Sequence, residues 1–229
     1  MRHRLAEYRL FWREFRHTFQ TTGAVLPSGR LLARALASRV GGDHRPQRIL
    51  EVGPGTGAVT DAIIPRLGPE DRLDLVELNA RFAGTLRDRL QQDPVWQPLA
   101  PRMRVLEMPV EQIEDGPRYD IIVSGLPLNN FPCESVAQIL QHFHRLAANR
   151  AQLSFFEYVA VRKAKALCSR PKERRRLTGI EQLLQREISS WRVARQCVVA
   201  NVPPAWVHHL CLPGTMSRRP KAVRSEAAT

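Results

Sequence analysis

The sequence lacks a long hydrophobic run, since no stretch reaches the roughly 18 consecutive apolar residues that mark a membrane-spanning helix. The first residues also lack the continuous apolar core of a secretory signal peptide. We therefore expect neither a spanning segment nor a leader. The four cysteines include no C-x-x-C pair, which excludes a paired-thiolate motif and indicates reduced residues in a cytosolic protein.

Acidic residues are scarce relative to basic ones, with 22 Asp and Glu against 35 Lys and Arg and a net charge of +13. Such an excess favours a partner that carries phosphate, either a nucleic acid or an anionic membrane surface. An arginine-rich composition inherited from a GC-rich genome would produce part of the same excess. The length of 229 residues and the hydrophobic content of 43% fit one α/β domain with some appended material.

The most informative local pattern is a buried strand that runs into a glycine turn. Residues 49–52 (Ile-Leu-Glu-Val) are apolar except for Glu51, and Gly53-Pro54-Gly55-Thr56-Gly57 follows directly. A helix is predicted over residues 58–64. Glycines let a ligand approach the backbone, and the helix start offers unpaired N–H groups. The third glycine comes one residue too early for the dinucleotide pattern G-x-G-x-x-G. E-x-G-x-G-x-G instead resembles the motif of Rossmann-like methyltransferases that use S-adenosylmethionine (SAM).

A second acid closes the next predicted strand, over residues 73–77. The carboxylate of Glu77 could accept hydrogen bonds from both ribose hydroxyls of an adenosyl group. Alternatively, Glu77 would be a favourable acid at the start of the helix predicted over residues 79–91. Both acids together indicate SAM, held by Glu51, by the glycine turn, and by Glu77 with its neighbour Leu78.

Strand and helix patterns continue to alternate along the chain. Further strands are predicted over 103–107, 119–123, 152–156, 193–202 and 205–212, and further helices over 29–40, 135–148 and 180–188. The last two strands would form an antiparallel hairpin. We therefore expect a Rossmann-like class I SAM-dependent methyltransferase fold, with a seven-stranded, mostly parallel sheet and an antiparallel last strand.

Ligands of open α/β sheets bind at the carboxyl ends of the strands, so the segments after the strands are candidate site residues. Related methyltransferases usually carry an aspartate for the adenine amino group after the third strand. Met108, Pro109 and Val110 occupy that place here, so we expect apolar and backbone contacts to adenine. The loop that begins at Ser124 should face the methyl group. Ser28 would either cap the helix that follows it or reach the cofactor.

The first twenty residues are predicted to form an amphipathic helix with an aromatic face. Its apolar side chains recur at steps of three and four, and arginines cover the remaining surface. This composition is typical of a helix that lies in a bilayer interface, although such a helix could equally pack its aromatic residues on the domain. The chain would thus comprise a membrane-docking helix (1–20), the methyltransferase domain (21–213) and a disordered basic tail (214–229).

Four motifs together resemble those of the bacterial phospholipid N-methyltransferases, the soluble type that acts on phosphatidylethanolamine. They lie at residues 23–28, 51–57, 124–127 and 201–205. The resemblance implies stepwise methylation of phosphatidylethanolamine toward phosphatidylcholine, with SAM as donor. It also implies a cytoplasmic protein that is peripheral on the inner face of the cell membrane. The partners would be that anionic surface and its lipids, with no nucleic acid; we expect a monomer.

Two alternatives remain open at this point. Ribosomal RNA adenine dimethyltransferases share the glycine motif and would also use a basic surface. Their catalytic loop carries an asparagine and an aromatic residue that hold a flipped adenine, whereas Ser124 and Leu128 replace them here. The second alternative is a lipid-surface binding protein with a vestigial SAM fold.

Methyl transfer to an amine requires alignment and a neutral nitrogen. An alkylamine such as lysine has a pKa near 10.4, which a dry pocket lowers, and a hydroxyl or carbonyl group can orient the lone pair. Ser124 and Tyr158 are the candidates for this role. Ser124 could instead shape the turn, and Tyr158 could be a packed aromatic. His142 and His144 are expected on a helix surface, the basic run 162–176 could bind lipid phosphate, and no metal site is predicted.

Overall fold

The structure is a computed structural model that describes residues 27–42, 45–114, 116, 118–158, 171–201 and 203–213, with backbone only for 27, 28 and 171–173. The predicted helix over residues 3–20, most of the basic run and the basic tail lie outside the described residues, and they stay predictions. Within the described part, no helix is both long and apolar enough to cross a bilayer.

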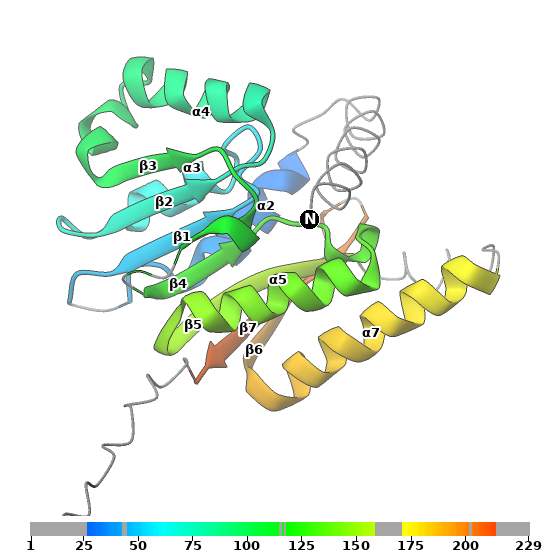
Figure 1. Cartoon of the computed structure of the whole chain (residues 1–229). Coiled ribbons are helices and arrows are strands. Elements are labelled where there is room, and N and C mark those ends of the chain that lie inside the picture. The colour runs from blue at the N-terminus through cyan, green and yellow to red at the C-terminus, as the bar shows by residue number, and fades with distance from the viewer. Residues whose placement is uncertain are drawn as a thin grey trace, which may run out of the picture.

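A single seven-stranded sheet organises the fold, in the order β3-β2-β1-β4-β5-β7-β6 (Figure 1). The strands are β1 (Arg48–Val52), β2 (Arg72–Val76), β3 (Met103–Leu106), β4 (Tyr119–Ser124), β5 (Ala147–Tyr158), β6 (Arg192–Val198) and β7 (Ala205–Leu212). Only β7 runs antiparallel to its neighbours β5 and β6. The topology confirms the predicted class I methyltransferase fold, including the hairpin that ends the sheet.

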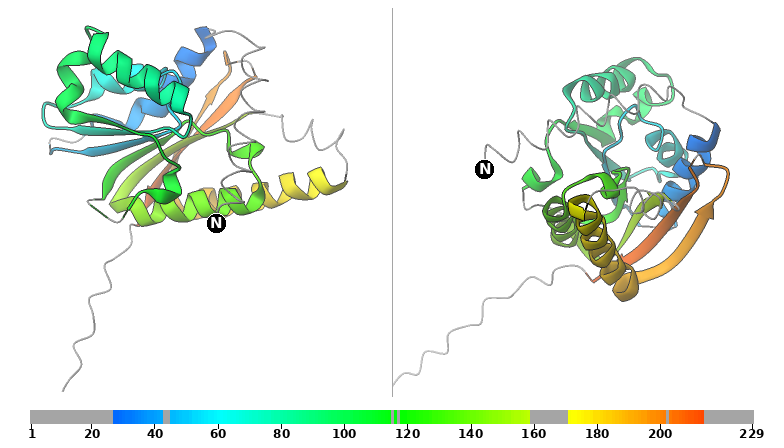
Figure 2. Two further views of the ribbon diagram at one scale, coloured as in Figure 1. Left: turned by 45° about the horizontal axis from the view of Figure 1, so that its top comes forward. Right: turned by 90° about the vertical axis from the view of Figure 1, so that its right-hand side faces the viewer.

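Helices cover both faces of the sheet, so the core has two halves. α2 (Pro27–Leu36), α3 (Thr60–Ile63) and α4 (Ala80–Gln92) contribute to one hydrophobic cluster, and α5 (Cys133–Leu146) and α7 (Pro171–Trp191) contribute to the other. Short 3-10 turns connect these elements: η1 (Ala37–Arg39), η2 (Ile64–Arg66), η3 (Gln97–Arg102), η4 (Val110–Gln112) and η5 (Leu128–Asn130). Figure 2 shows α5 and α7 side by side on one face of the sheet, with α2 on the opposite face.

Two elements are longer than their sequence patterns predict. α7 spans residues 171–191 rather than 180–188. The sequence pattern misses its first turns because they are mostly charged, and among the side chains described before Ile180 only Leu177 is buried. The helix is continuous through Gly179, which lets it pack closely against α5, since a Cβ there would lie 3.0 Å from Cys133 Sγ. β5 begins at residue 147 rather than 152, and its early pairing with β4 shifts register beside Tyr119.

An ionic network around the buried Asp74 ties four strands together in the amino-terminal half of the sheet. The Asp74 carboxylate on β2 accepts hydrogen bonds from Arg104 on β3, at 2.6 and 2.7 Å, and from the Tyr119 hydroxyl on β4, at 2.8 Å. Arg48 on β1 forms an ion pair with Asp74 at 3.5 Å. Burial, followed by the Asp74 charge, raises the pKa of Tyr119 to about 12. This Asp74 network therefore connects β1 to β4 near their amino-terminal ends, at the opposite end of the strands from the glycine turn.

Candidate active site

The glycine turn that follows β1 adopts a backbone that L side chains rarely adopt. The φ angles of Gly53, Gly55 and Gly57 are 72°, 59° and 93°, in the left-handed region that favours glycine. A Cβ at Gly53 would lie 2.7 Å from Leu126, whereas a Cβ at Gly55 would meet nothing within 4 Å. The turn thus packs tightly against the β4 loop at Gly53 and leaves open space above Gly55.

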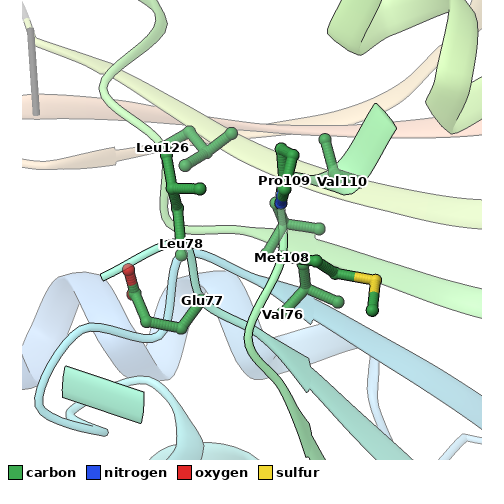
Figure 3. Close-up of a pocket in the computed structure, with 9 residues that line it drawn as sticks. Val76, Glu77, Leu78, Met108, Pro109, Val110 and Leu126 are labelled. Atoms are coloured by element: carbon green, nitrogen blue, oxygen red, sulfur yellow. The ribbon is translucent and has the colours of Figure 1, made fainter. Parts of the chain in front are cut away.

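A pocket opens to solvent at the carboxyl ends of the first strands. Figure 3 shows Glu77, Leu78 and Leu126 on one side and Met108, Pro109 and Val110 on the other, with Val52, Gly53 and Val76 completing the lining. Five predicted site residues therefore line one cavity: Gly53, Glu77, Leu78, Pro109 and Val110. Met108 lies beside Pro109 and Val110 as predicted, whereas Leu126 was missing from the predicted set although it stands in the segment that follows β4.

Glu77 is the only ionisable residue in that lining, and its side chain is almost fully buried. Its Oε2 accepts a hydrogen bond from the Gly55 N–H at 3.0 Å, and its Oε1 accepts one from the Asn79 N–H at 2.8 Å. Burial raises the pKa of Glu77 above its ordinary value, and these N–H donors oppose that rise. A carboxylate has about four lone-pair sites, so each oxygen could also accept a ribose hydroxyl.

Glu51 lies on β1 beneath the turn and does not belong to the pocket lining. The Thr60 hydroxyl donates to its Oε2 at 2.8 Å, while no group in the described part of the chain donates to its Oε1. Complete burial is the main reason why the pKa of Glu51 rises to about 8, and the charges of Asp61 and Glu77 add to the rise. A buried, incompletely bonded carboxyl is suited to a cationic ligand group.

Gly57 and Thr56 are held from outside by a cluster of side chains from α3, α4 and the turn that precedes η3. The Arg89 guanidinium donates to the Thr56 carbonyl at 3.2 Å and forms an ion pair with Asp61 at 2.7 Å. The same guanidinium lies 4.0 Å from the centre of the Trp96 ring. A Cβ at Gly57 would come within 2.8 Å of Trp96 and 2.7 Å of Arg89. Gly57 therefore contacts the supporting cluster, and Pro54 beside it is buried.

The loop after β4 carries the predicted acceptor residues. Ser124 is fully buried, and its Oγ accepts a long hydrogen bond of 3.4 Å from the Leu126 N–H. Further along, the Arg176 guanidinium of α7 donates to the carbonyls of Asn129 and Phe131, at 3.1 and 2.5 Å. The predicted loop thus depends on a helix that follows it by more than forty residues.

Tyr158 lies further along the sheet than the sequence alone indicates. β4 and β5 are neighbours, as predicted, and Val123 pairs with Ser154, so Ser124 lies beside Phe155. Tyr158 is three residues further, a distance of roughly 10 Å along the strand. Its ring packs edge-on against Phe156 at 5.1 Å between centroids, and burial raises the pKa of its hydroxyl.

Three further sequence candidates fall elsewhere. His142 contacts the Gln138 carbonyl of its own helix at 2.8 Å, and His144 contacts Glu187 on α7 at 2.8 Å, which agrees with the expected surface or packing roles. Ser28 lies in the first turn of α2, and its side chain is outside the described atoms. A role for Ser28 toward the cofactor stays a prediction.

Comparison with known proteins agrees with this geometry. Residues 49–150 match the family described as methyltransferase domain. The SAM-bound magnesium protoporphyrin IX methyltransferase of Synechocystis PCC 6803 superposes with a TM-score of 0.57 at 15% identity, over 83% of this chain and 86% of that one. The chain carries a SAM-dependent methyltransferase domain. SAM is its cofactor, and two features of the site fit this ligand: the open space above Gly55 and the incompletely bonded carboxyl of Glu51.

Two curated relatives of this methyltransferase domain differ in the substrate that their names state. An ornithine lipid N-methyltransferase of Singulisphaera acidiphila is 28% identical over 132 residues, which is 57% of this chain and 67% of that protein. The ribosomal RNA small subunit methyltransferase A of Parasynechococcus marenigrum is 37% identical over 82 residues, which is 36% of this chain and 26% of that protein. The likeness to the ribosomal RNA enzyme is therefore confined to about a quarter of its length.

Proposed function

We propose that this protein transfers the methyl group of SAM to the amino head group of phosphatidylethanolamine and its partly methylated forms, toward phosphatidylcholine, at an anionic membrane surface. The observation that carries the proposal is the match to a lipid N-methyltransferase over 57% of the chain. Phosphatidylethanolamine and ornithine lipids share a primary amine near the membrane surface, so one acceptor site would suit either head group.

The shape of the acceptor loop supports a small, flexible acceptor rather than a base. Leu126 and Leu128 are both buried in the core cluster beneath α5, as is Phe131. A flipped adenine needs an exposed aromatic or apolar platform, and these three side chains do not offer one. The ribosomal RNA adenine dimethyltransferase is retained as the second candidate because the local identity to such an enzyme reaches 37%.

The charge distribution supports a phosphate-bearing surface as partner. The chain carries a net charge of +13, and Arg174 and Arg175 are exposed in the first described side chains of α7. The neighbouring Arg176 holds the acceptor loop, so these arginines lie at the same edge of the sheet as the loop. Each basic residue near an anionic surface contributes about 1 kcal/mol.

Within this proposal the chain provides position and a dry environment. SAM supplies an electrophilic methyl group on a sulfonium leaving group. Glu77 and the turn at Gly53 and Gly55 fix the adenosyl group, while the Ser124 loop brings the amine nitrogen into line with the methyl group. Such alignment accounts for much of the rate enhancement in transfers of this kind. The apolar lining at Met108 and Leu126 excludes water from the pocket.

The test is a paired turnover assay with radiolabelled SAM. Vesicles of phosphatidylethanolamine mixed with an anionic lipid, vesicles containing ornithine lipid, and ribosomal RNA are the three acceptors. Each reaction without protein is the blank, and Glu77→Gln at low SAM is the variant expected to have reduced turnover. We expect label in phosphatidylethanolamine and none in RNA. Label in ornithine lipid alone would replace the proposed substrate, and label in RNA alone would replace the proposed function. Loss of vesicle sedimentation on removal of residues 1–20 would support the membrane-docking role of that segment.

A further inference from the structure

A buried acid and a buried histidine face each other across two strands at the carboxyl edge of the sheet. Glu157 on β5 and His208 on β7 are 5% and 3% exposed. Glu157 Oε2 lies 3.1 Å from His208 Nε2. The Phe155 ring stacks on the imidazole with 5.2 Å between centroids and an interplanar angle of 21°. Placing two ionisable groups in the interior costs free energy, so a role beyond packing deserves a test.

The strand register places this pair close to the acceptor loop. Ser124 ends β4 and lies beside Phe155, because Val123 pairs with Ser154. Side chains alternate between faces along a strand, so Ser124, Phe155 and Glu157 all lie on the face that α5 and α7 cover. Glu157 is two residues beyond Phe155, roughly 7 Å along β5. The pair is thus one strand away from Ser124, at the edge where ligands of open α/β sheets bind.

The reaction creates a need for such a pair. An alkylamine is protonated at neutral pH, so the nitrogen must release a proton before its lone pair can attack the methyl group. We propose that Glu157 and His208 act as the proton acceptor for the substrate amine, an inference that rests on the amine methylation proposed above. The proton passes from the ammonium to the pair, the new C–N bond forms, and the electrons of the broken S–CH₃ bond stay on sulfur. The pair then returns the proton to solvent.

The surroundings of the pair are mostly apolar in the described part of the chain. α7 presents Ile180 and Leu184 to the same core cluster that contains Phe155. Among the described residues, the charged or titratable groups nearby are Arg195 on β6, which pairs with His208 in the register, His209 and Arg39 on the other face, and the partly buried Tyr158. The Arg195 guanidinium lies 3.9 Å from the centre of the Trp206 ring. A proton placed on the pair is therefore poorly screened by water.

A merely structural pairing of β5 with β7 is the competing explanation, and the chain contains a matched control for it. His144 on α5 and Glu187 on α7 form a second His–Glu pair at 2.8 Å, with side chains 27% and 22% exposed. This control pair also joins two elements, but it lies on the outer helices. His208→Gln and His144→Gln therefore each remove the histidine of a His–Glu pair, one at the carboxyl edge of the sheet and one on the outer helices.

The experiment measures kcat/KM for phosphatidylethanolamine methylation from pH 6.5 to 9.5 in four proteins: wild type, Glu157→Gln, His208→Gln and His144→Gln. General bases typically contribute 100- to 10,000-fold, so we expect Glu157→Gln to lower kcat/KM by about 100-fold at pH 7. The deficit should shrink as pH rises, because the free amine in solution then loses its proton unaided. His208→Gln should show the same pattern, and His144→Gln should resemble wild type.

Calorimetry with S-adenosylhomocysteine verifies folding of each variant, because cofactor binding does not involve the pair. A deficit in Glu157→Gln that is equal at all pH values, or no deficit, overturns the inference while leaving the proposed function intact. If Glu157→Gln fails to bind S-adenosylhomocysteine, the pH profile of His208→Gln decides in its place. Absence of wild-type turnover with any amine lipid overturns the proposed function itself, so the two failures are distinguishable.

Discussion

The N–H of Gly55 donates a hydrogen bond of 3.0 Å to Oε2 of Glu77, so the glycine turn after β1 and the end of β2 form one unit. Hydrogen bonds to a charged group contribute about 1.5–3 kcal/mol each. We expect Glu77→Gln to weaken binding of S-adenosylhomocysteine by about 10- to 100-fold, as measured by calorimetry. The exposed Glu181→Gln on α7 is the charge-matched control. Equal affinity in wild type and Glu77→Gln would remove Glu77 from the cofactor site.

Replacement of glycine by alanine should change the free energy of unfolding in opposite directions at Gly57 and Gly84. Gly57→Ala places a methyl group against Arg89 and Trp96 at a φ of 93°, so we expect a loss of about 1–3 kcal/mol in unfolding free energy. Gly84→Ala in α4 meets nothing within 4 Å, and it should stabilise the helix by about 0.5–1 kcal/mol. Urea unfolding of both variants checks the pair, and similar effects in the two would contradict the assigned packing of Gly57.

Buried Glu51 predicts a stability that declines with rising pH in the cofactor-free protein. Its pKa is about 8 in the folded state against 4.5 as the ordinary value. The folded state therefore binds more protons between these values, and its advantage is complete below pH 4.5 and lost as pH rises through 8. The slope from this group is at most about 1.4 kcal/mol per pH unit.

His209 contributes in the opposite direction at lower pH. Burial is the main cause that lowers the pKa of His209 to about 4, so its contribution to stability is complete above pH 6.5 and is lost as pH falls through 4. Urea unfolding between pH 6.5 and 8 thus avoids the contribution of His209, and comparison with Glu51→Gln separates Glu51 from Glu77, whose pKa is also raised. Unfolding free energy should fall across this window in wild type and change less in Glu51→Gln. Parallel curves for the two proteins would exclude a neutral Glu51.

The bonds from Arg176 to the carbonyls of Asn129 and Phe131 predict an effect on the acceptor alone. Without them the loop after Ser124 should lose its fixed shape, so we expect Arg176→Met to raise KM for the lipid amine by about tenfold. Affinity for S-adenosylhomocysteine should stay unchanged, because the pocket lining does not include this loop beyond Leu126. Arg186→Met, an exposed position on the same helix, is the control. Weakened cofactor binding in Arg176→Met would point to a general structural role.

The sequence predicts the sheet well because each central strand is a short apolar run that ends at a recognisable turn. Residues 49–52 and 119–123 are buried on both faces of the sheet. Such strands appear in the sequence as nearly continuous apolar runs, so they can be predicted without knowledge of the strands that pair with them. The long helix over 171–191 was predicted only in its apolar half, because charged residues hide the period of its first turns. The first buried side chain described in this helix is Leu177, and a single apolar position before Ile180 does not establish a helical period.

The cofactor pocket was likewise predicted in part, where neighbouring strand ends form it, and missed in part, where distant segments meet. Gly53, Glu77, Leu78, Pro109 and Val110 were predicted because the fold brings the carboxyl ends of neighbouring strands together. Long-range contacts escaped prediction: the Arg176 bonds to the acceptor loop and the Glu157–His208 pair both join segments more than forty residues apart. Their residue types are common on protein surfaces, so nothing in the local sequence distinguishes them.

The Asp74 network stabilises the amino-terminal half of the sheet, whereas the cofactor pocket lies at the carboxyl ends of the strands. Arg104, Tyr119 and Arg48 converge on Asp74 at the amino-terminal half, on the far side from the cofactor. Substitutions among these four residues should alter melting temperature while leaving the choice of methyl acceptor untouched. Exchange of the acceptor loop for that of another enzyme could therefore be preceded by substitutions that strengthen the Asp74 network. The added stability of the domain would offset the loss caused by a less stable loop.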